Sequence, residues 1–216
     1  MGIIVSGDFN PDEMIIKIDQ YFSGLESKPV PKYTFKPESP ITAPVVKEVY
    51  GPDAEFVAIG YRFPGVHSED ALMADLVSQI LTNGRAGLID LNLVKKQKLL
   101  RAYASADILV DYGYLNLQGT PTTGQSLEDV KTLMLGEIDN LKNGNFDDDL
   151  LVSIVNNQKK AMMQQSEKYG SRASALMNAF TGEEDWLNDV AYTDQLSKLT
   201  KKDIIAQRDD KKIKLG

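Results

Sequence analysis

The 216-residue sequence contains no cysteine and a single histidine, His67. The absence of cysteine excludes disulfide frameworks, redox dithiols and cysteine nucleophiles. Zinc sites take most of their ligands from histidine and cysteine, so neither a zinc finger nor a two-histidine metallopeptidase motif fits into this chain. Any site that remains is either free of histidine or built around His67.

Basic charge and long apolar runs are also scarce. The 24 lysines and arginines stand against 31 aspartates and glutamates, which gives a formal net charge of −7. An acidic chain argues against nucleic-acid binding, which requires a basic stripe, and against docking on anionic lipid. No apolar run approaches the roughly 18 residues of a membrane-spanning helix. We therefore expect neither a nucleic-acid partner nor membrane contact by this chain.

Three short motifs carry candidate chemistry. His67 precedes Glu69 and Asp70, but neighbouring positions on a helix do not converge on one point, so we interpret it as a helix-entry residue. The segment 8–13 begins like a calcium loop, yet its sixth position is a glutamate where the turn requires glycine. Residues 84–87, Gly-Arg-Ala-Gly, suit an anion site at a helix start or an ordinary turn between helices, and we favour the turn.

Other candidates fail more simply. A serine nucleophile needs a base, and the spacing places no serine and aspartate with the only histidine. The single tryptophan, Trp186, is expected in the core. The sequence thus predicts no catalytic, cofactor-binding or metal-binding residue in this chain.

The N-terminal quarter predicts three domain segments. Residues 3–7 read as a strand and residues 11–23 as a helix, with Asn10 and Glu13 in a capping-box arrangement. Residues 26–44 hold five of the nine prolines, which is typical of an extended linker. We expect residues 1–25 to end a preceding domain, 26–44 to be the linker, and 45–216 to be the main domain, truncated near its C-terminus. Because the chain starts in mid-strand, we expect the natural protein to extend upstream, with any localisation signal there.

The main segment alternates strand and helix patterns. Strands are predicted at 45–50, 55–63, 99–110 and 112–118. Helices are predicted at 69–82 after Ser68, in a helical stretch through 88–98, after Ser126 with Asp129 as its cap partner, after Asp147, at 171–180 and 185–198, and from Thr200. Strands followed by helices indicate an α+β fold, a two-layer sandwich or roll with a mostly antiparallel sheet backed by helices.

Three segments in this order resemble the insulinase/pitrilysin family of zinc peptidases, which includes the mitochondrial processing peptidases. Residues 5–15, VSGDFNPDEMI, resemble the strand and helix that close its catalytic-type domain. Residues 57–66, VAIGYRFPGV, with the apolar helix after them and Gly84-Arg85, resemble the opening of the next domain. Residues 199–204, LTKKDI, resemble a capped helix near that domain's end.

This resemblance implies the metallopeptidase, processing peptidase-like fold and a parent protein that hydrolyses peptides in a closed chamber. Zinc in that parent is bound by an H-x-x-E-H motif and a distal glutamate. One histidine cannot supply two, so the chain resembles the non-catalytic second domain. The resemblance further implies other domains of the same chain, or a homologous subunit, as partners, with zinc and peptide substrate bound by the parent and no cofactor in this chain.

Second domains of the family often carry an arginine followed seven residues later by a tyrosine, a pair that binds the substrate carbonyl and stabilises the oxyanion. Aligning on Tyr103 places Lys96 at the arginine position. Aligning on Leu99 instead places Val94 there and Arg101 at the tyrosine position. Lysine replaces a bidentate arginine poorly, so the pair is incomplete in either alignment.

Three functions remain open. We expect a non-catalytic domain of an insulinase-like zinc peptidase that shapes the chamber and its interdomain contacts, with no peptidase activity of its own. The alternative is an inactive family member that acts as an assembly or core-type subunit. A third hypothesis is a free-standing small-molecule enzyme that uses His67 or a carboxylate pair. An H-x-x-E-H motif upstream of Gly2 would separate the first two.

Overall fold

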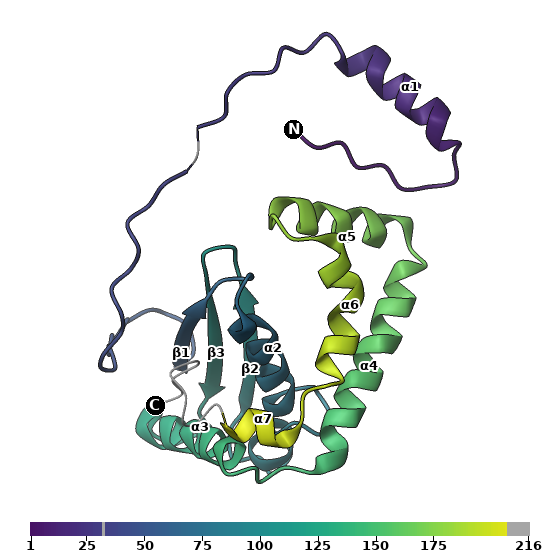
Figure 1. Ribbon diagram of the computed structural model, residues 1–216. Coiled ribbons are helices and arrows are strands. Elements are labelled where there is room, and N and C mark those ends of the chain that lie inside the picture. The colour runs from purple at the N-terminus through teal and green to yellow at the C-terminus, as the bar shows by residue number, and fades with distance from the viewer. Residues whose placement is uncertain (32, 207–216) are drawn as a thin grey trace. The chain divides into compact units, whose positions relative to one another are not determined.

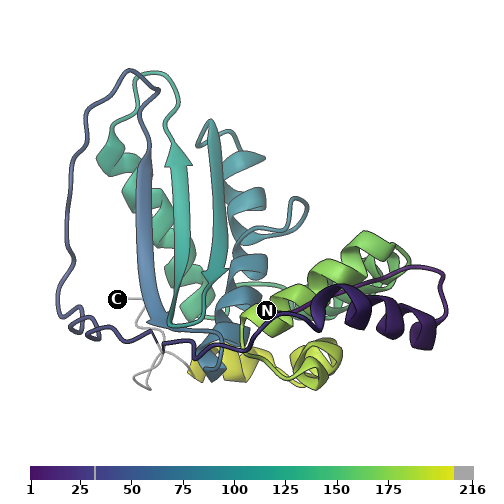
Figure 2. The ribbon, with the colours of Figure 1, turned by 90° about the horizontal axis from the view of Figure 1, so that it is seen from above.

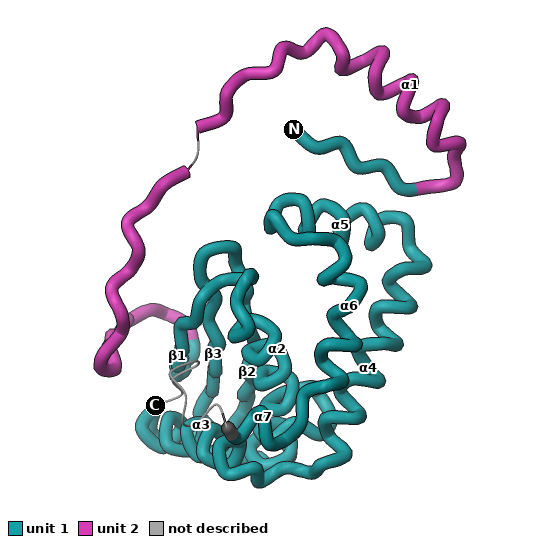
Figure 3. The backbone as a smooth tube through the Cα atoms, in the orientation of Figure 1, with its two compact units in different colours: residues 1–6, 54–216 teal, residues 7–53 magenta. Residues whose placement is uncertain are grey.

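The computed structural model describes residues 1–31 and 33–206 and divides the chain into two compact units. One unit comprises residues 1–6 and 54–216, and the other comprises residues 7–53 (Figure 3). The domain boundaries at residues 25 and 44 stay predictions.

The smaller unit contains one helix, α1 (Pro11–Phe22), among its described residues. The side chain of Asn10 caps it by accepting a hydrogen bond from the Asp12 N–H at 3.0 Å. The predicted capping box is wrong, because no reciprocal bond from Glu13 is present in the described part of the chain. Residues 23–31 and 33–53 form neither helix nor strand.

Two predicted strands are absent from the described residues, those at 3–7 and 45–50. Ile3 and Val5 are 39% and 42% exposed, and Val49 is 93% exposed. An apolar run becomes a strand only when a neighbouring strand completes its hydrogen-bond ladder. Neither segment is paired with any strand of the described sheet, so the apolar pattern alone gave the wrong structure.

The larger unit is built on a three-stranded antiparallel sheet. Its strands are β1 (Val57–Pro64), β2 (Arg101–Ile108) and β3 (Tyr112–Thr120), in the order β1-β3-β2. Leu115 and Leu117 on β3 are fully buried, whereas the alternating Tyr114 is 44% exposed. Since side chains alternate across a strand, one face of the sheet is the core face and the other is open. The predicted antiparallel sheet is confirmed.

Two helices cover the core face, α2 (Glu69–Leu81) and α3 (Leu127–Lys142), as Figure 2 lets the reader follow. Nine of the thirteen residues of α2 are buried, and Leu76, Ile80 and Leu81 lie at its centre. A Cβ atom on Gly119 of β3 would lie 2.8 Å from the Val130 side chain of α3, so helix and sheet pack in close contact. The α+β layering predicted from the order of elements is therefore confirmed.

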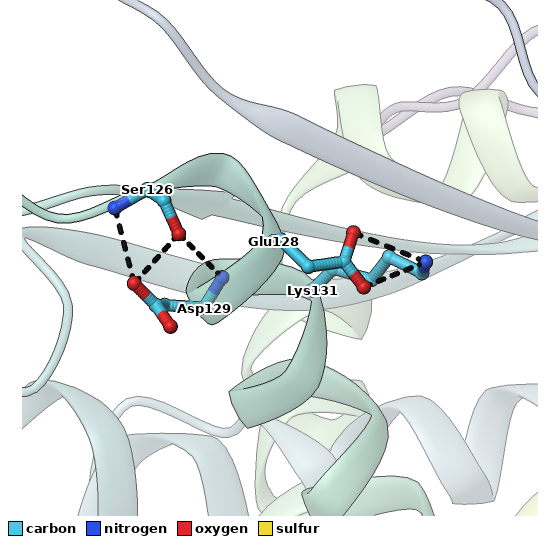
Figure 4. A network of polar contacts seen from close by, with 4 residues as sticks. All are labelled: Ser126, Glu128, Asp129 and Lys131. Atoms are coloured by element: carbon cyan, nitrogen blue, oxygen red, sulfur yellow. Dashed lines mark hydrogen bonds and ion pairs between the residues drawn. The ribbon is translucent and has the colours of Figure 1, made fainter.

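The starts of α2 and α3 differ from each other. The Ser68 hydroxyl donates to the Gly65 carbonyl at 2.7 Å and does not accept from the helix, so its predicted capping bond is wrong. At α3 the prediction is confirmed: the Ser126 hydroxyl accepts from the Asp129 N–H at 3.1 Å, and the Ser126 N–H donates to the Asp129 carboxylate at 3.2 Å (Figure 4). This capping box satisfies two N–H groups at the helix start.

The predicted helical stretch through residues 88–98 is confirmed over residues 88–94 and wrong at its end. It contains a single-turn π-helix at Asp90–Val94, after which the chain turns. Gln97 has φ 54°, a left-handed conformation that ends the helix before the charged run can extend it.

The remaining helices form what we call the helical arm, α4 (Asp148–Ser166), α5 (Tyr169–Thr181) and α6 (Trp186–Leu196), followed by α7 (Lys201–Ala206) (Figure 1). Leu150, Ile154 and Leu196 anchor the arm in the core. Trp186 is 39% exposed, so its predicted place in the core is wrong. No helix in the described ranges is long and apolar enough to cross a membrane.

Candidate functional site

His67 lies exposed in the turn between β1 and α2, as predicted for a helix-entry residue. Within residues 1–31 and 33–206, no three His, Cys, Asp or Glu side chains gather so that they could bind a metal ion. A zinc ion of the peptidase type requires two histidines and a carboxylate, and these side chains do not supply them. The donor set of this chain therefore does not fit the family's metal.

The glycine turn at 84–87 already has its N–H groups occupied by the protein itself. The Asp90 carboxylate accepts from the Asn83 and Gly84 N–H groups at 2.9 and 2.8 Å. The Asn83 amide oxygen accepts from the next two N–H groups, at 3.1 and 2.9 Å. Because Asp90 occupies the place an anion would take, this segment is an ordinary turn between helices.

Segment 8–13 leads directly into α1, and Asn10 uses its side-chain oxygen as the helix cap. That oxygen is thus directed at the backbone and not at a cation. The calcium-loop interpretation has no geometric support here.

The incomplete arginine–tyrosine pair is split between two elements. Lys96 lies in the turn after the π-helix, where its Nζ donates to the Asn92 side chain at 3.1 Å. Tyr103 lies on β2 and donates from its hydroxyl to Gln118 Oε1 on β3 at 2.8 Å. Arg101, the other candidate, is exposed at the first position of β2. Lys96 and Tyr103 are hydrogen-bonded to nearby side chains, and Arg101 faces solvent. None of them supplies the bidentate arginine of the family's pair.

The strand residues that alternate with the core residues share the open side of the sheet, which we call the open sheet face, and most of them are polar or aromatic. Its members are Ala58, Gly60, Arg62, Arg101, Tyr103, Ser105, Asp107, Tyr112, Tyr114, Asn116 and Gln118. The register places Arg62, Tyr114 and Asp107 side by side on neighbouring strands. The Arg62 guanidinium lies 5.3 Å from the centroid of the Tyr112 ring.

The chemistry of the open sheet face suits contact with a peptide or a partner. Tyrosine and arginine offer apolar area with hydrogen-bonding tips, and they are enriched where proteins bind peptides and partners. The Asp107 carboxylate raises the pKa of the neighbouring Tyr114 hydroxyl, mainly by its negative charge, so this tyrosine remains a neutral hydrogen-bond donor. No heavy atom lies within 4 Å of a Cβ built on Gly60, so the backbone itself is accessible there.

A second surface is the groove between α2 and the helical arm, which we call the helical groove. It has a volume of about 2080 Å³ and is lined from α2, α4, α5 and α6. At its edge the Tyr192 hydroxyl of α6 donates to the Asp75 carboxylate of α2, which also accepts from the Gln79 amide at 2.8 Å. Burial and the Asp75 charge raise the pKa of Tyr192 far above its usual range.

Sequence reasoning missed both surfaces, although each left a signal. Tyr112 and Tyr114 alternate with buried β3 positions, and this alternation predicts one solvent-facing side. Asp75 interrupts the apolar pattern of α2, which indicates a polar contact to a distant element. The identity of that element, α6, could not follow from local sequence.

Comparison with known proteins places this fold in one family. Residues 1–158 match the family of the peptidase M16 inactive domain. A protease from Helicobacter pylori has a similar structure, with a TM-score of 0.78 and 20% identity over 94% of this chain and 50% of that one. No curated protein matches the chain.

Two further structures show the same fold. The first half of the periplasmic protease PqqL from Escherichia coli gives a TM-score of 0.61 and 16% identity over 93% of this chain and 46% of that one. The inactive peptidase domain of a protein described as a zinc protease, from Bordetella parapertussis, gives 0.60 and 17% over 70% and 82%. This chain thus spans about half the length of the Helicobacter pylori protease. It belongs to the peptidase M16 inactive-domain family of insulinase-like zinc proteases.

Proposed function

We propose that this chain is the non-catalytic domain of an insulinase-family zinc peptidase, in which the open sheet face forms part of the wall of a peptide-binding chamber. The family match over residues 1–158 supports the role of an inactive domain. The unsuited metal donor set supports a zinc site elsewhere in the parent protein. The open sheet face is the observation that carries the wall role, because it offers hydrogen bonds and aromatic area to a bound peptide.

The wall role explains the composition of this face. A chamber that accepts many peptides requires side chains that contact a backbone without demanding a particular sequence. Tyr103 and Tyr114, 40% and 44% exposed, can contact a peptide backbone through their hydroxyls and its side chains through their rings.

The test uses the natural full-length protein with Tyr103 and Tyr114 both replaced by alanine. The KM for peptide hydrolysis should rise about tenfold, because peptide contacts are lost, while the zinc content stays the same, because neither tyrosine binds the metal. Tyr21→Ala is the matched control, since Tyr21 is 82% exposed in the smaller unit. An unchanged KM in the double variant would exclude the open sheet face from the chamber. Stoichiometric zinc or peptide hydrolysis in the isolated 216-residue chain would overturn the inactive-domain role.

The second candidate function, an assembly or core-type subunit, is favoured by the apolar exposure of the helical arm. Phe180, Leu187 and Val190 are 59%, 68% and 55% exposed. Such a surface is typical of a protein contact. A full-length protein that has no H-x-x-E-H motif but purifies in a defined complex would favour this function over the chamber wall.

A further inference from the structure

The helical groove is larger than a typical small-molecule site. Small-molecule pockets usually have volumes of roughly 300–1,000 Å³. This groove measures about 2080 Å³. A helix with its side chains is about 10–12 Å across, so the same volume holds about four helical turns. The size therefore fits a peptide helix.

The walls of the groove have the composition that binds amphipathic helices. Both sides contribute apolar side chains, several of them flexible methionines and leucines: Leu72, Met73, Met162, Met163, Ala175, Leu176, Trp186 and Val190. Met163 is 70% exposed and Val190 is 55% exposed, so both side chains remain accessible to a bound helix. Methionine adapts to varied apolar shapes and recurs in grooves that accept helices.

The charge of the groove selects the kind of helix. Five carboxylates line it, those of Glu69, Asp75, Glu184, Asp189 and Asp203, against the two cations Lys168 and Arg172. The Thr200 hydroxyl lowers the pKa of the Asp203 carboxyl, so this group stays ionised. Asp75 and Asp203 already accept hydrogen bonds within the chain, so Glu184 and Asp189 supply most of the complementarity to lysine and arginine.

The groove's own cations are partly occupied. The Arg172 Nε donates to the Ser166 carbonyl, and its guanidinium lies 5.3 Å from the centroid of the Tyr169 ring. Arg172 thus closes the α4–α5 corner and is less available to neutralise the acidic lining. A second copy of this chain would bring the same acidic groove and a net charge of −7, which opposes self-association through this face.

We propose that the helical groove binds an amphipathic helix of another protein or domain, about four turns long, with one apolar face and lysines or arginines along its flanks. The apolar face lies against the methionine and Trp186 side of the groove, and the basic flank lies against Glu184 and Asp189. This binding function is independent of the chamber wall and stands whether or not the parent hydrolyses peptides.

Trp186, the only tryptophan, reports on binding because it lines the groove. The experiment titrates the purified chain with two synthetic 15-residue helices that share one leucine and isoleucine face. One helix carries lysine and arginine flanks, and the other carries glutamate flanks. The basic helix should shift Trp186 emission to shorter wavelength, bind about five- to tenfold more tightly than the acidic one, and weaken as salt is added.

Two sets of variants test the geometry. In the double charge reversal Glu184→Lys with Asp189→Lys, the preference should move toward the acidic helix by about the same factor, and circular dichroism should show the fold unchanged. Val190→Asp should abolish binding of both helices. Val152→Asp is the matched control, because Val152 is 60% exposed on α4 and does not line the groove.

Three results would overturn the proposal. The first is that the folded chain binds neither helix. The second is equal binding of both helices, unaffected by the charge reversal, which would mean non-specific apolar contact. The third is a dimer by light scattering that Val190→Asp converts to monomer, which would assign the groove to a second copy of this chain.

Discussion

Helices α2 and α5 contain similar numbers of apolar residues, but those of α2 are mostly buried and those of α5 are mostly exposed. In α2, nine of thirteen residues are buried, between the sheet and the neighbouring helices. In α5 only Ala179 is buried, and Leu176, Met177 and Phe180 are 37%, 50% and 59% exposed. The difference shows that α2 holds the fold together, while α5 presents exposed apolar groups that contribute little to the isolated chain's stability.

The sharpest test of this comparison is an aspartate in each region. Leu76→Asp in α2 should unfold the chain, with a loss above about 4 kcal/mol, because Leu76 is 1% exposed and no partner awaits a charge there. Leu187→Asp in α6 is the control, since Leu187 is 68% exposed. Urea unfolding followed by circular dichroism measures both. A cooperatively melting, soluble Leu76→Asp variant would contradict the assigned core.

A second test compares a glycine in close contact with the backbone, Gly65, with a glycine that has open space around it, Gly60. Gly65→Ala should cost about 3 kcal/mol, because its Cβ would lie 1.9 Å from the Val110 carbonyl oxygen, and a backbone atom yields little. Gly60→Ala should change stability by less than about 0.5 kcal/mol, since no heavy atom lies within 4 Å of the new Cβ. Thermal melts of the two variants measure the difference. Equal melting temperatures would refute the close approach at Gly65.

The third prediction concerns the joint between arm and core, where Tyr192 donates to Asp75. Tyr192→Phe should cost about 1–2 kcal/mol at neutral pH, because a hydrogen bond to a carboxylate is lost. The folded-state pKa of Tyr192 is raised, first by burial and then by the Asp75 charge. The folded form therefore retains the proton above pH 10, while the unfolded form releases it.

The raised pKa of Tyr192 makes the stability of the fold depend on pH. The stability contribution of Tyr192 is complete below the unfolded pKa of about 10 and is lost as the pH rises above that value. The stability difference between the natural protein and Tyr192→Phe should accordingly shrink from pH 10 upward, as denaturant titrations at several pH values would show. Tyr21→Phe should show no such convergence, because Tyr21 is 82% exposed and pairs with no buried carboxylate. A constant difference across this range would refute the Tyr192–Asp75 contact.

The smallest expected effect is at the α3 cap. Ser126→Ala should cost about 1 kcal/mol, as loss of an N-cap usually does. The Ser126 hydroxyl and N–H lower the pKa of the Asp129 carboxyl. Their contribution is present above the unfolded pKa and is lost as the pH falls below about 4. Below about pH 4, the stability of Ser126→Ala should therefore fall less with decreasing pH than that of the natural protein. Lys131→Ala, which breaks an exposed pair with Glu128, is the near-silent control.

The sequence was most informative where local chemistry and burial agree. Ser126 and Asp129 satisfy one helix start by themselves, so their spacing predicted the observed bonds. The alternation through β3 and the apolar density of α2 likewise predicted their elements, because each side chain meets the core its pattern requires. Family resemblance from three short motifs led to the correct family.

Prediction failed where the outcome depends on a distant partner. Val45–Tyr50 has strand composition but no strand beside it in the described sheet. Ser68 has the right position for a cap, yet the Gly65 carbonyl competes for its hydroxyl. Trp186 is of a residue type usually found in the core, but it lies partly exposed at the start of α6 in the helical arm. The helical groove needed α2 and α6 side by side, which no local spacing encodes.

The strand order β1-β3-β2 also bears on how the chain folds. β2 and β3 are joined by a short turn and can pair as a local hairpin. β1 ends at Pro64 and must wait for β3, which begins at Tyr112, before it gains any partner in the sheet. During synthesis, β1 and the apolar α2 therefore emerge well before the strand that shelters them. Since loop closure across this interval costs entropy, we expect the docking of β1 to be the slow, topology-limited step of folding.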